Sequence, residues 1–245
     1  MYEYYIFSFV LILIVGAWSY SASAKVQRTF QAQMQIGTRS RMTGYDTAVR
    51  LLRANGISDV SVHRVKGTLT DHYHPTKAQV NLSDVVYANT SIAAVAVAAH
   101  EIGHVMQKKS GYAPYKLRSV LVPITNIGSR LALPLVLIGL ILDIAVGFTQ
   151  EQTLGYTLAL AGVAMYGLST VFALATLPVE YDASRRAKKM LVEQGIITEQ
   201  ELPYADQMLD AAAKTYVAAL ATSLVYFLRF AIWVLMIFGN RSRRD

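Results

Sequence analysis

The chain has 245 residues, of which 53% are hydrophobic and 16% are charged, so it is too apolar for an ordinary soluble domain and too long for a single membrane anchor. It contains no cysteine, which excludes a disulfide framework and leaves histidine and carboxylate side chains as the strong ligands for a transition metal. The formal net charge is +7, but the basic residues cluster beside apolar runs without the aromatic interleaving of an RNA-binding module. The composition therefore predicts a multi-pass membrane protein and no binding of nucleic acid.

The first apolar run covers residues 4–20, which is close to the minimum length for a membrane-spanning helix. A secretory signal peptide is the alternative, because the Ala-Ser-Ala sequence at residues 22–24 resembles a cleavage site. The positive charge that usually precedes the apolar part of a signal peptide is missing, and Glu3 stands there instead. We therefore expect residues 1–24 to be a retained membrane anchor.

The polar segment that follows, residues 25–118, is expected to be a small α+β catalytic domain. Thr43 and Asp46 have the spacing of an N-terminal helix cap, and Gly56 is typical of a helix end. Alternating and β-branched residues then predict strands, and a small apolar run predicts a second helix that is partly buried. The predicted strands cover residues 60–65 and 78–83, and the second helix covers residues 91–108.

Three further apolar runs are long enough to cross a membrane. They cover residues 131–148, 154–177 and 216–238. The first two lie within a predicted helical hairpin over residues 119–178, whose helices are expected to end or kink at Pro123, Pro134 and Pro178. The last run belongs to a predicted C-terminal membrane helix and basic tail over residues 216–245. Because it contains Arg229, this run could cross the membrane fully, form a re-entrant segment or lie on the membrane surface.

Basic residues near the ends of the apolar runs predict the orientation of the chain. No Lys or Arg precedes the first run or separates the second from the third, whereas basic residues flank residues 25–118 and follow the third run at residues 185–189. We therefore expect residues 25–118 and 179–215 to face the cytoplasm, with Gln150 on the opposite side. Four full spans would place the basic tail, residues 241–244, on that opposite side as well.

The sequence AVAVAAHEIGHVMQ contains an HExxH motif formed by His100, Glu101 and His104. Four residues turn an α-helix by about 400° and advance it by about 6 Å, so both imidazoles project from one face and can share a tetrahedral ion. Glu101 then lies beside the ion, where it can take a proton from zinc-activated water and pass it to the leaving amine. The alternative is a pair of core histidines, but a buried glutamate beside them then requires a partner.

A catalytic zinc site takes three protein ligands and leaves the fourth position to water, so a third ligand is needed. Glu180, in the sequence LPVEYDASRRA, directly follows the third apolar run and is expected on the same side of the membrane as the HExxH motif, at the start of a helix. Its alternative role is a carboxylate that the helix dipole stabilises. Tyr181 and Asp182 are candidates for supporting roles around the site.

Three segments together resemble the YugP-like membrane zinc metallopeptidases, which are distantly similar to the HtpX-type gluzincins: SIAAVAVAAHEIGHVMQ, DHYHPTKAQVNLS and LPVEYDASRRAKKML. The resemblance covers essentially the whole chain. It implies a zincin-like catalytic domain in a multi-pass protein of the cell membrane, acting on peptide or membrane-protein substrates. It also implies one catalytic Zn²⁺ held by His100, His104 and Glu180, with Glu101 as the general base. His74 departs from the family pattern, in which we expect an aspartate.

Two features near the HExxH motif allow more than one interpretation. Asp71, His72 and His74 could form a second metal site or stabilise an oxyanion, although such residues beside Pro75 are more often turn residues. The strand predicted at residues 78–83 resembles in position the edge strand with which zincins pair extended substrates.

The sequence leaves two other functions open. In an intramembrane protease of the site-2 type, the HExxH motif lies inside a span and Leu142-Asp143 supplies the third ligand. However, only residues 92–99 are continuously apolar before His100, where about 20 residues are needed. A non-catalytic membrane scaffold or metal sensor is the second alternative, but structural zinc sites usually use four protein ligands and would leave Glu101 without a role. No pattern indicates the substrate sequence or the oligomeric state.

Overall fold

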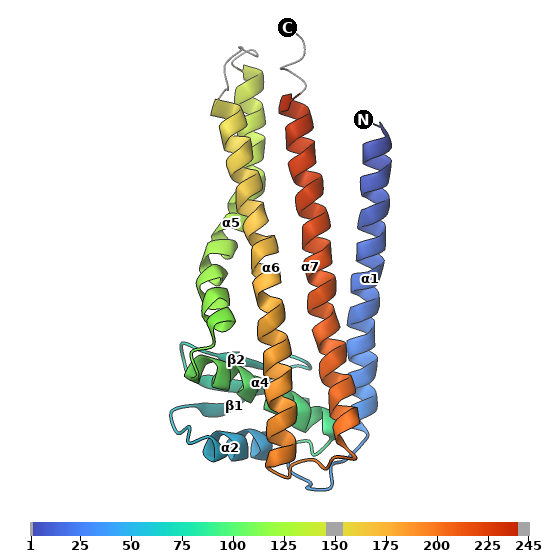
Figure 1. Ribbon diagram of the computed structural model, residues 1–245, viewed down its shortest axis with the longest axis vertical. Helices are drawn as coiled ribbons and strands as arrows, with labels where there is room; N and C mark the ends of the chain where they lie inside the picture. The colour runs from blue at the N-terminus through green and yellow to red at the C-terminus, as the bar shows by residue number, and fades with distance from the viewer. Residues whose placement is uncertain (1, 146–153, 240–245) are drawn as a thin grey trace. The chain divides into compact units, whose positions relative to one another are not determined.

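The computed structural model describes residues 2–145 and 154–239 (Figure 1). Helices and strands in this part of the chain follow the order α1 (Tyr2–Met34), α2 (Gly44–Ala54), β1 (Ser61–Val65), β2 (His72–His74), β3 (Gln79–Ser83), α3 (Asp84–Tyr87), α4 (Ile92–Lys109), α5 (Ala113–Ala145), α6 (Leu154–Glu193) and α7 (Leu202–Gly239). They form two compact units. The sheet-containing unit comprises Tyr20–Lys116 and Leu177–Tyr216, and the helical unit comprises the other described residues.

Among the described helices, 4 are long and apolar enough to cross a membrane: α1, α5, α6 and α7. The structure therefore confirms the predicted number of candidate spans by length and composition. Gln150 and the basic tail at residues 241–244, which the orientation prediction places on the far side, lie outside the described residues.

Each candidate span is part of a helix that is longer than the apolar run that predicted it. Helix α1 continues through Met34, and α7 already begins at Leu202. The prolines do not end the helices, because Pro123 and Pro134 lie inside α5 and Pro178 lies inside α6. A proline removes one backbone donor, and the helix continues past it in each case.

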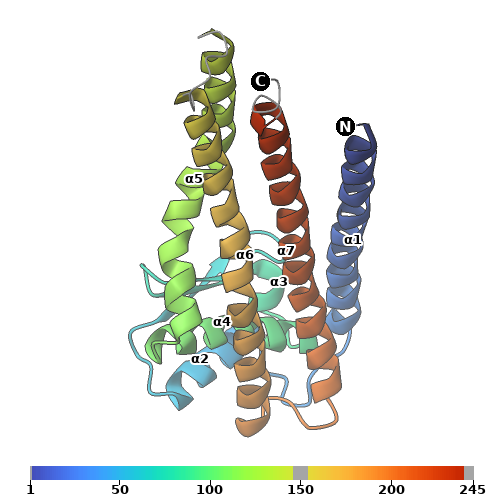
Figure 2. The same ribbon diagram turned by 45° about the horizontal axis from the view of Figure 1, so that its top comes forward.

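Helices α5 and α6 lie side by side in the helical unit, as both Figure 1 and Figure 2 show. Small residues allow this close approach, since a β-carbon on Gly162 of α6 would lie 2.6 Å from the Ala132 carbonyl oxygen of α5. The Tyr4 hydroxyl of α1 donates a hydrogen bond of 2.7 Å to the carbonyl oxygen of Arg229 on α7. A second hydrogen bond, of 2.9 Å, joins Thr170 Oγ1 of α6 and Ser223 Oγ of α7, so close packing and polar contacts connect the helices of this unit.

The sheet of the other unit has the strand order β1-β3-β2. Strand β3 is parallel to β1 and antiparallel to β2, and Val80 of β3 is paired with Val62 on one side and Tyr73 on the other. Residues 78–83 resemble in position the substrate-pairing edge strand of zincins, but β3 is not an edge strand here, because hydrogen bonds already occupy both of its sides. The reason is that the short polar segment His72–His74 also forms a strand, although its composition gives little indication of one.

Helix α4 is held in the core of the sheet-containing unit. Leu51 of α2, Leu82 of β3 and Ile102 of α4 are fully buried in one hydrophobic cluster. The predicted cap of α2 is confirmed, since the backbone N–H of Asp46 donates to Thr43 Oγ1 over 3.0 Å within a complete capping box. Helix α4 is thus packed with α2 and β3 in one core.

Candidate metal centre

Helix α4 carries both histidines of the HExxH motif on one face. The His100 and His104 rings lie with their centroids 4.8 Å apart and their planes at 85°. His104 is buried and His100 is partly buried. The two imidazoles lie next to each other, as the spacing of four residues on a helix predicts.

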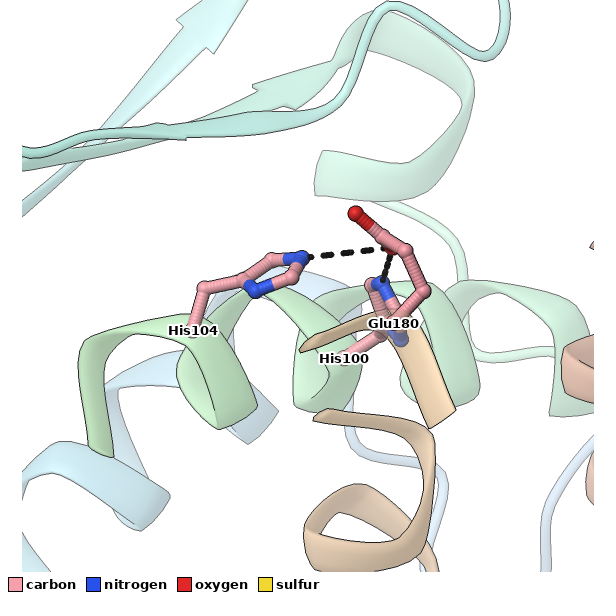
Figure 3. A group of neighbouring side chains, drawn as sticks. All are labelled: His100, His104 and Glu180. Atoms are coloured by element: carbon pink, nitrogen blue, oxygen red, sulfur yellow. Dashed lines mark hydrogen bonds and ion pairs between the residues drawn. The ribbon is translucent and has the colours of Figure 1, made fainter. Parts of the chain in front are cut away.

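Glu180 reaches the two histidines from helix α6 (Figure 3). Its Oε2 atom lies 3.2 Å from His100 Nε2 and 3.6 Å from His104 Nε2. The expectation that Glu180 starts a helix is wrong, because α6 runs without interruption through Pro178 and places Glu180 in its interior. Stabilisation by a helix N-terminus therefore does not explain this buried carboxylate, which is 2% exposed.

Two separations among the three side chains are close to those around a tetrahedral zinc ion. Ligand atoms about 2.0–2.1 Å from a tetrahedral ion lie about 3.3–3.4 Å from one another. The separations of 3.2 Å and 3.6 Å between Glu180 Oε2 and the two Nε2 atoms bracket that range. Within residues 2–145 and 154–239, His100, His104 and Glu180 form the one group of at least three potential ligands whose donor atoms converge, within 4.8 Å of one another. Two neutral imidazoles and one carboxylate form a donor set that zinc accepts in catalytic sites.

Gln107 determines which nitrogen of His104 faces the site. The Gln107 Nε2 atom donates to the Val179 carbonyl oxygen over 2.7 Å and to Asp182 Oδ2 over 3.0 Å. Because both partners are acceptors, they determine the orientation of the Gln107 amide. Its Oε1 atom then faces His104 Nδ1 at 3.0 Å, and only a protonated Nδ1 can donate to it. The lone pair of a neutral His104 is consequently on Nε2, which points to Glu180.

Polar contacts also support His100 and Asp182. His100 Nδ1 lies 3.2 Å from Ser184 Oγ, a hydroxyl one helical turn after Glu180. The buried Asp182 forms ion pairs with Arg185 and Arg186, the second over 2.6 Å between Oδ2 and Nε. The buried carboxylate that holds Gln107 is therefore itself compensated by positive charge.

The electrostatics of the pocket favour positive charge at His104. Burial lowers the pKa of His104, but the hydrogen bond and charge of Glu180 and the charge of Glu101 together raise it by more, so the pKa is above its ordinary value. The same negative groups that stabilise a protonated imidazole would stabilise a divalent cation in its place.

Glu101 lies in α4 beside the metal-ligand candidates and is 6% exposed. Among the described residues, no hydrogen-bond donor to its carboxylate is present, so the side chain stays available to a substrate or water. Together with His100, Glu180 and Ser184, it lines one cavity. This arrangement matches a proton-transfer group placed next to a metal and not a fourth ligand.

Asp71, His72 and His74 do not join the three-residue group. Asp71 accepts hydrogen bonds from the Ser83 backbone N–H over 2.7 Å and from Ser83 Oγ over 2.9 Å. Burial and the nearby negative charge of Glu101 raise the pKa of Asp71, whereas the hydrogen bonds from Ser83 lower it. Burial has the largest effect, and the pKa of Asp71 is raised. His72 and His74 lie in β2, where His72 contacts Asn81 and His74 Nδ1 accepts the Lys77 N–H. The two histidines thus stabilise strand and turn structure, and Asp71 also lines the cavity.

Gln107 and Ser184 contact the two histidines, and the sequence pattern did not single them out. A signal for both was present, because Gln107 follows His104 by three residues and Ser184 follows Glu180 by four, and such residues are neighbours on a helix. Asp143, the ligand of the site-2 alternative, lies in α5, and its side chain is outside the described part of the chain.

The known proteins that match the chain agree with this chemistry. The family model described as "Putative neutral zinc metallopeptidase" matches residues 5–235. The "Putative membrane protease YugP" of Bacillus subtilis (strain 168) is 40% identical over 235 residues, which cover 96% of this chain and 97% of that protein. No solved structure matches the chain significantly.

Proposed function

The chain belongs to the neutral zinc metallopeptidase family, and from this premise we propose that it is a membrane-embedded endopeptidase with one catalytic zinc ion. In this proposal His100, His104 and Glu180 hold the zinc, and Glu101 is the general base. The observation that carries the proposal is the convergence of Glu180 Oε2 on both Nε2 atoms, at 3.2 Å and 3.6 Å, while Glu101 lines one cavity with His100 and Glu180. The substrates are peptides or membrane proteins.

The side chains around the site divide the chemistry between them. When bound, zinc supplies a Lewis acid that polarises the peptide carbonyl and lowers the pKa of water to about 7. Glu101 accepts the proton of the attacking water and then donates it to the leaving amine. Gln107 and Ser184 keep the Nδ1 sides of the two histidines occupied, so that both Nε2 atoms face the same point.

The surrounding fold supports a zincin-like interpretation of the sheet-containing unit. The HExxH helix α4 is packed in the same core as the central strand β3, and a second helix, α6, supplies the glutamate. We place this unit, with residues 25–118 and 179–215, at the cytoplasmic face, since the basic residues flank these segments.

The two alternatives are less well supported. A site-2-type protease requires its HExxH helix inside the membrane, yet α4 is not among the described helices that are candidate spans. A zinc scaffold would usually close all four positions with protein ligands, whereas the described residues bring three together here. It would also leave the buried Glu101 carboxylate without a function.

Replacement of the proposed base tests the function. Glu101→Gln is expected to retain stoichiometric zinc and to lose at least about 100-fold in peptidase activity, because the side chain acts on water and not on the ion. Metal analysis and a casein-cleavage assay on the purified chain measure both quantities. Glu199→Gln, at an exposed glutamate, is the matched control and should keep both. If Glu101→Gln kept full activity, Glu101 would have no role in the mechanism. If the variant lost zinc, Glu101 would instead be a zinc ligand.

A further inference from the structure

The cavity at the metal centre extends well beyond the polar residues described above. It has a volume of about 270 Å³ and lies within the sheet-containing unit. Its polar lining residues are Asp71, His100, Glu101, Glu180 and Ser184. The cavity therefore includes two of the three metal-ligand candidates and the proposed base.

The rest of the wall is mainly apolar and comes from several elements. Val26 of α1, Val97 of α4 and Leu69 of the β1–β2 loop contribute aliphatic side chains. The largest share comes from one face of α7, whose residues recur at helical spacing: Met208, Leu209, Ala212, Ala213, Thr215 and Tyr216. Met208 and Leu209 are 2% and 3% exposed, so this wall is fixed by packing.

The alanines are the reason that space remains next to the metal centre. A larger side chain at residue 212 or 213 would extend into the cavity that these residues line. At about 270 Å³, the cavity is somewhat smaller than the roughly 300–1,000 Å³ of pockets that enclose drug-sized ligands. It is thus suited to one large side chain and not to a whole peptide.

We propose that this cavity is a specificity pocket that binds a large apolar side chain of the substrate, such as leucine, methionine or phenylalanine, next to the scissile bond. The inference rests on the proposed peptidase function and adds a substrate class to it. Its occupant follows from continuity, because the apolar wall lines the same cavity as His100, Glu101 and Glu180. A charged side chain would lose its hydration against the aliphatic residues of this wall without gaining a partner from them.

Leu69 gives separate support to the pocket. It is 38% exposed and has a φ of 56°, in the left-handed region that favours glycine. Backbone strain of this kind persists where the surrounding structure holds it, often at ligand-binding sites. Here it places an exposed apolar side chain at the wall of the cavity, from a loop far in sequence from the α7 residues.

A binding experiment without catalysis tests the pocket. The full chain carrying Glu101→Gln is placed in lipid nanodiscs with zinc and titrated with dansyl-Ala-Ala-Leu-Ala-Ala-amide and with the same peptide carrying glycine in place of leucine. The leucine peptide should bind at least about tenfold more tightly, because its side chain is removed from water. Adding Ala212→Leu, which extends a larger side chain into the cavity, should bring the two affinities closer together at unchanged zinc content.

Two further variants keep the result interpretable. Ala219→Leu adds the same atoms at an exposed position one heptad further along α7 and should keep the preference for leucine. Leu69→Gly removes side-chain contact while relieving the left-handed backbone, so it should fold and still lower the affinity for the leucine peptide severalfold. The proposed pocket would be overturned if the Glu101→Gln protein bound the two peptides equally. It would also be overturned if adding Ala212→Leu or Leu69→Gly left the preference for the leucine peptide unchanged.

Cleavage-site mapping on casein gives a second readout. The active enzyme should cut beside large apolar residues, and Ala212→Leu should shift the cuts toward small ones, with kcat/KM for large residues falling about tenfold or more. Cleavage without a preference for apolar residues would overturn the pocket and leave the peptidase function intact. An absence of hydrolysis would contradict the peptidase function, and the peptide titration would still decide whether the pocket binds apolar side chains.

Discussion

Gly103 of α4 and Ala183 of α6 lie so close that no side chain fits between them. A β-carbon on residue 103 would lie 2.6 Å from the Ala183 carbonyl oxygen and 3.0 Å from its Cα. This contact falls between His100 and His104 on one helix and next to Glu180 on the other. The approach of the two backbones therefore brings the third ligand candidate to the histidines.

Gly103→Ala should disturb the site through packing alone. The added methyl group meets backbone atoms, which cannot move aside as a flexible side chain would, so α4 and α6 must separate. We expect a loss of about 1–3 kcal/mol in the free energy of unfolding, together with reduced zinc content. Gly16→Ala is the control, because Gly16 is also helical and a β-carbon there would have nothing within 4 Å. Normal zinc content in Gly103→Ala would contradict the role of this contact.

Gln107→Met should weaken zinc binding without removing a ligand. The variant loses the acceptor for His104 Nδ1 and the donor to Asp182, so His104 is no longer held in one tautomer and orientation. The zinc affinity, measured by competition with a chelating dye, should fall about 10- to 100-fold. Gln31→Met, at an exposed position of α1, should leave the affinity unchanged. Equal affinities for both variants would exclude Gln107 as a positioning residue.

Glu180→Gln should lower zinc content and peptidase activity together, because a neutral amide replaces the proposed anionic ligand. Asp143→Asn should leave zinc bound, since the site-2 arrangement is the one that needs this carboxylate. Both quantities are measured on purified protein by metal analysis and casein cleavage. The reverse pattern, with zinc lost from Asp143→Asn and kept by Glu180→Gln, would move the metal site into the membrane and refute the proposed ligands.

Removing zinc should destabilise the sheet-containing unit. A ligand present at about 1,000 times its Kd contributes about 4 kcal/mol to stability, which corresponds to a shift in Tm of roughly 10 °C for a chain of this size. Addition of a strong chelator should therefore lower the Tm of the parent protein by roughly that amount. The same chelator should have little effect on Glu180→Gln, which has little zinc to lose. An equal shift in both proteins would show that the chelator acts elsewhere.

Single cysteines should reveal the orientation of the chain directly, because the natural sequence contains none. Ser58→Cys, at an exposed residue of the sheet-containing unit, and Gln150→Cys, outside the described residues, are expected on opposite sides of the membrane. A membrane-impermeant thiol reagent added to intact cells should label the cysteine at 150 and spare the one at 58. The same accessibility for both would contradict the four-span orientation.

Features that depend on neighbouring residues could be predicted from the amino-acid order alone. The spacing of His100 and His104, the capping box at Thr43 and Asp46 and the length of the apolar runs are local, since helix period, cap chemistry and membrane thickness act over a few turns. These predictions agree with α4, α2 and the candidate spans. The same kind of local rule predicts that the helix ends or kinks at Pro178, and the chain has no helix end there.

The way in which distant segments meet depends on the tertiary structure. Strand β3 is central because a short polar segment, His72–His74, pairs along its second side, and backbone pairing of that kind leaves almost no pattern in composition. Glu180 meets the histidines because Gly103 lets α6 approach α4, and Gln107 contacts Asp182 across the same interface. Such contacts depend on close packing between residues about 75–80 positions apart, which periodicity within one helix does not encode.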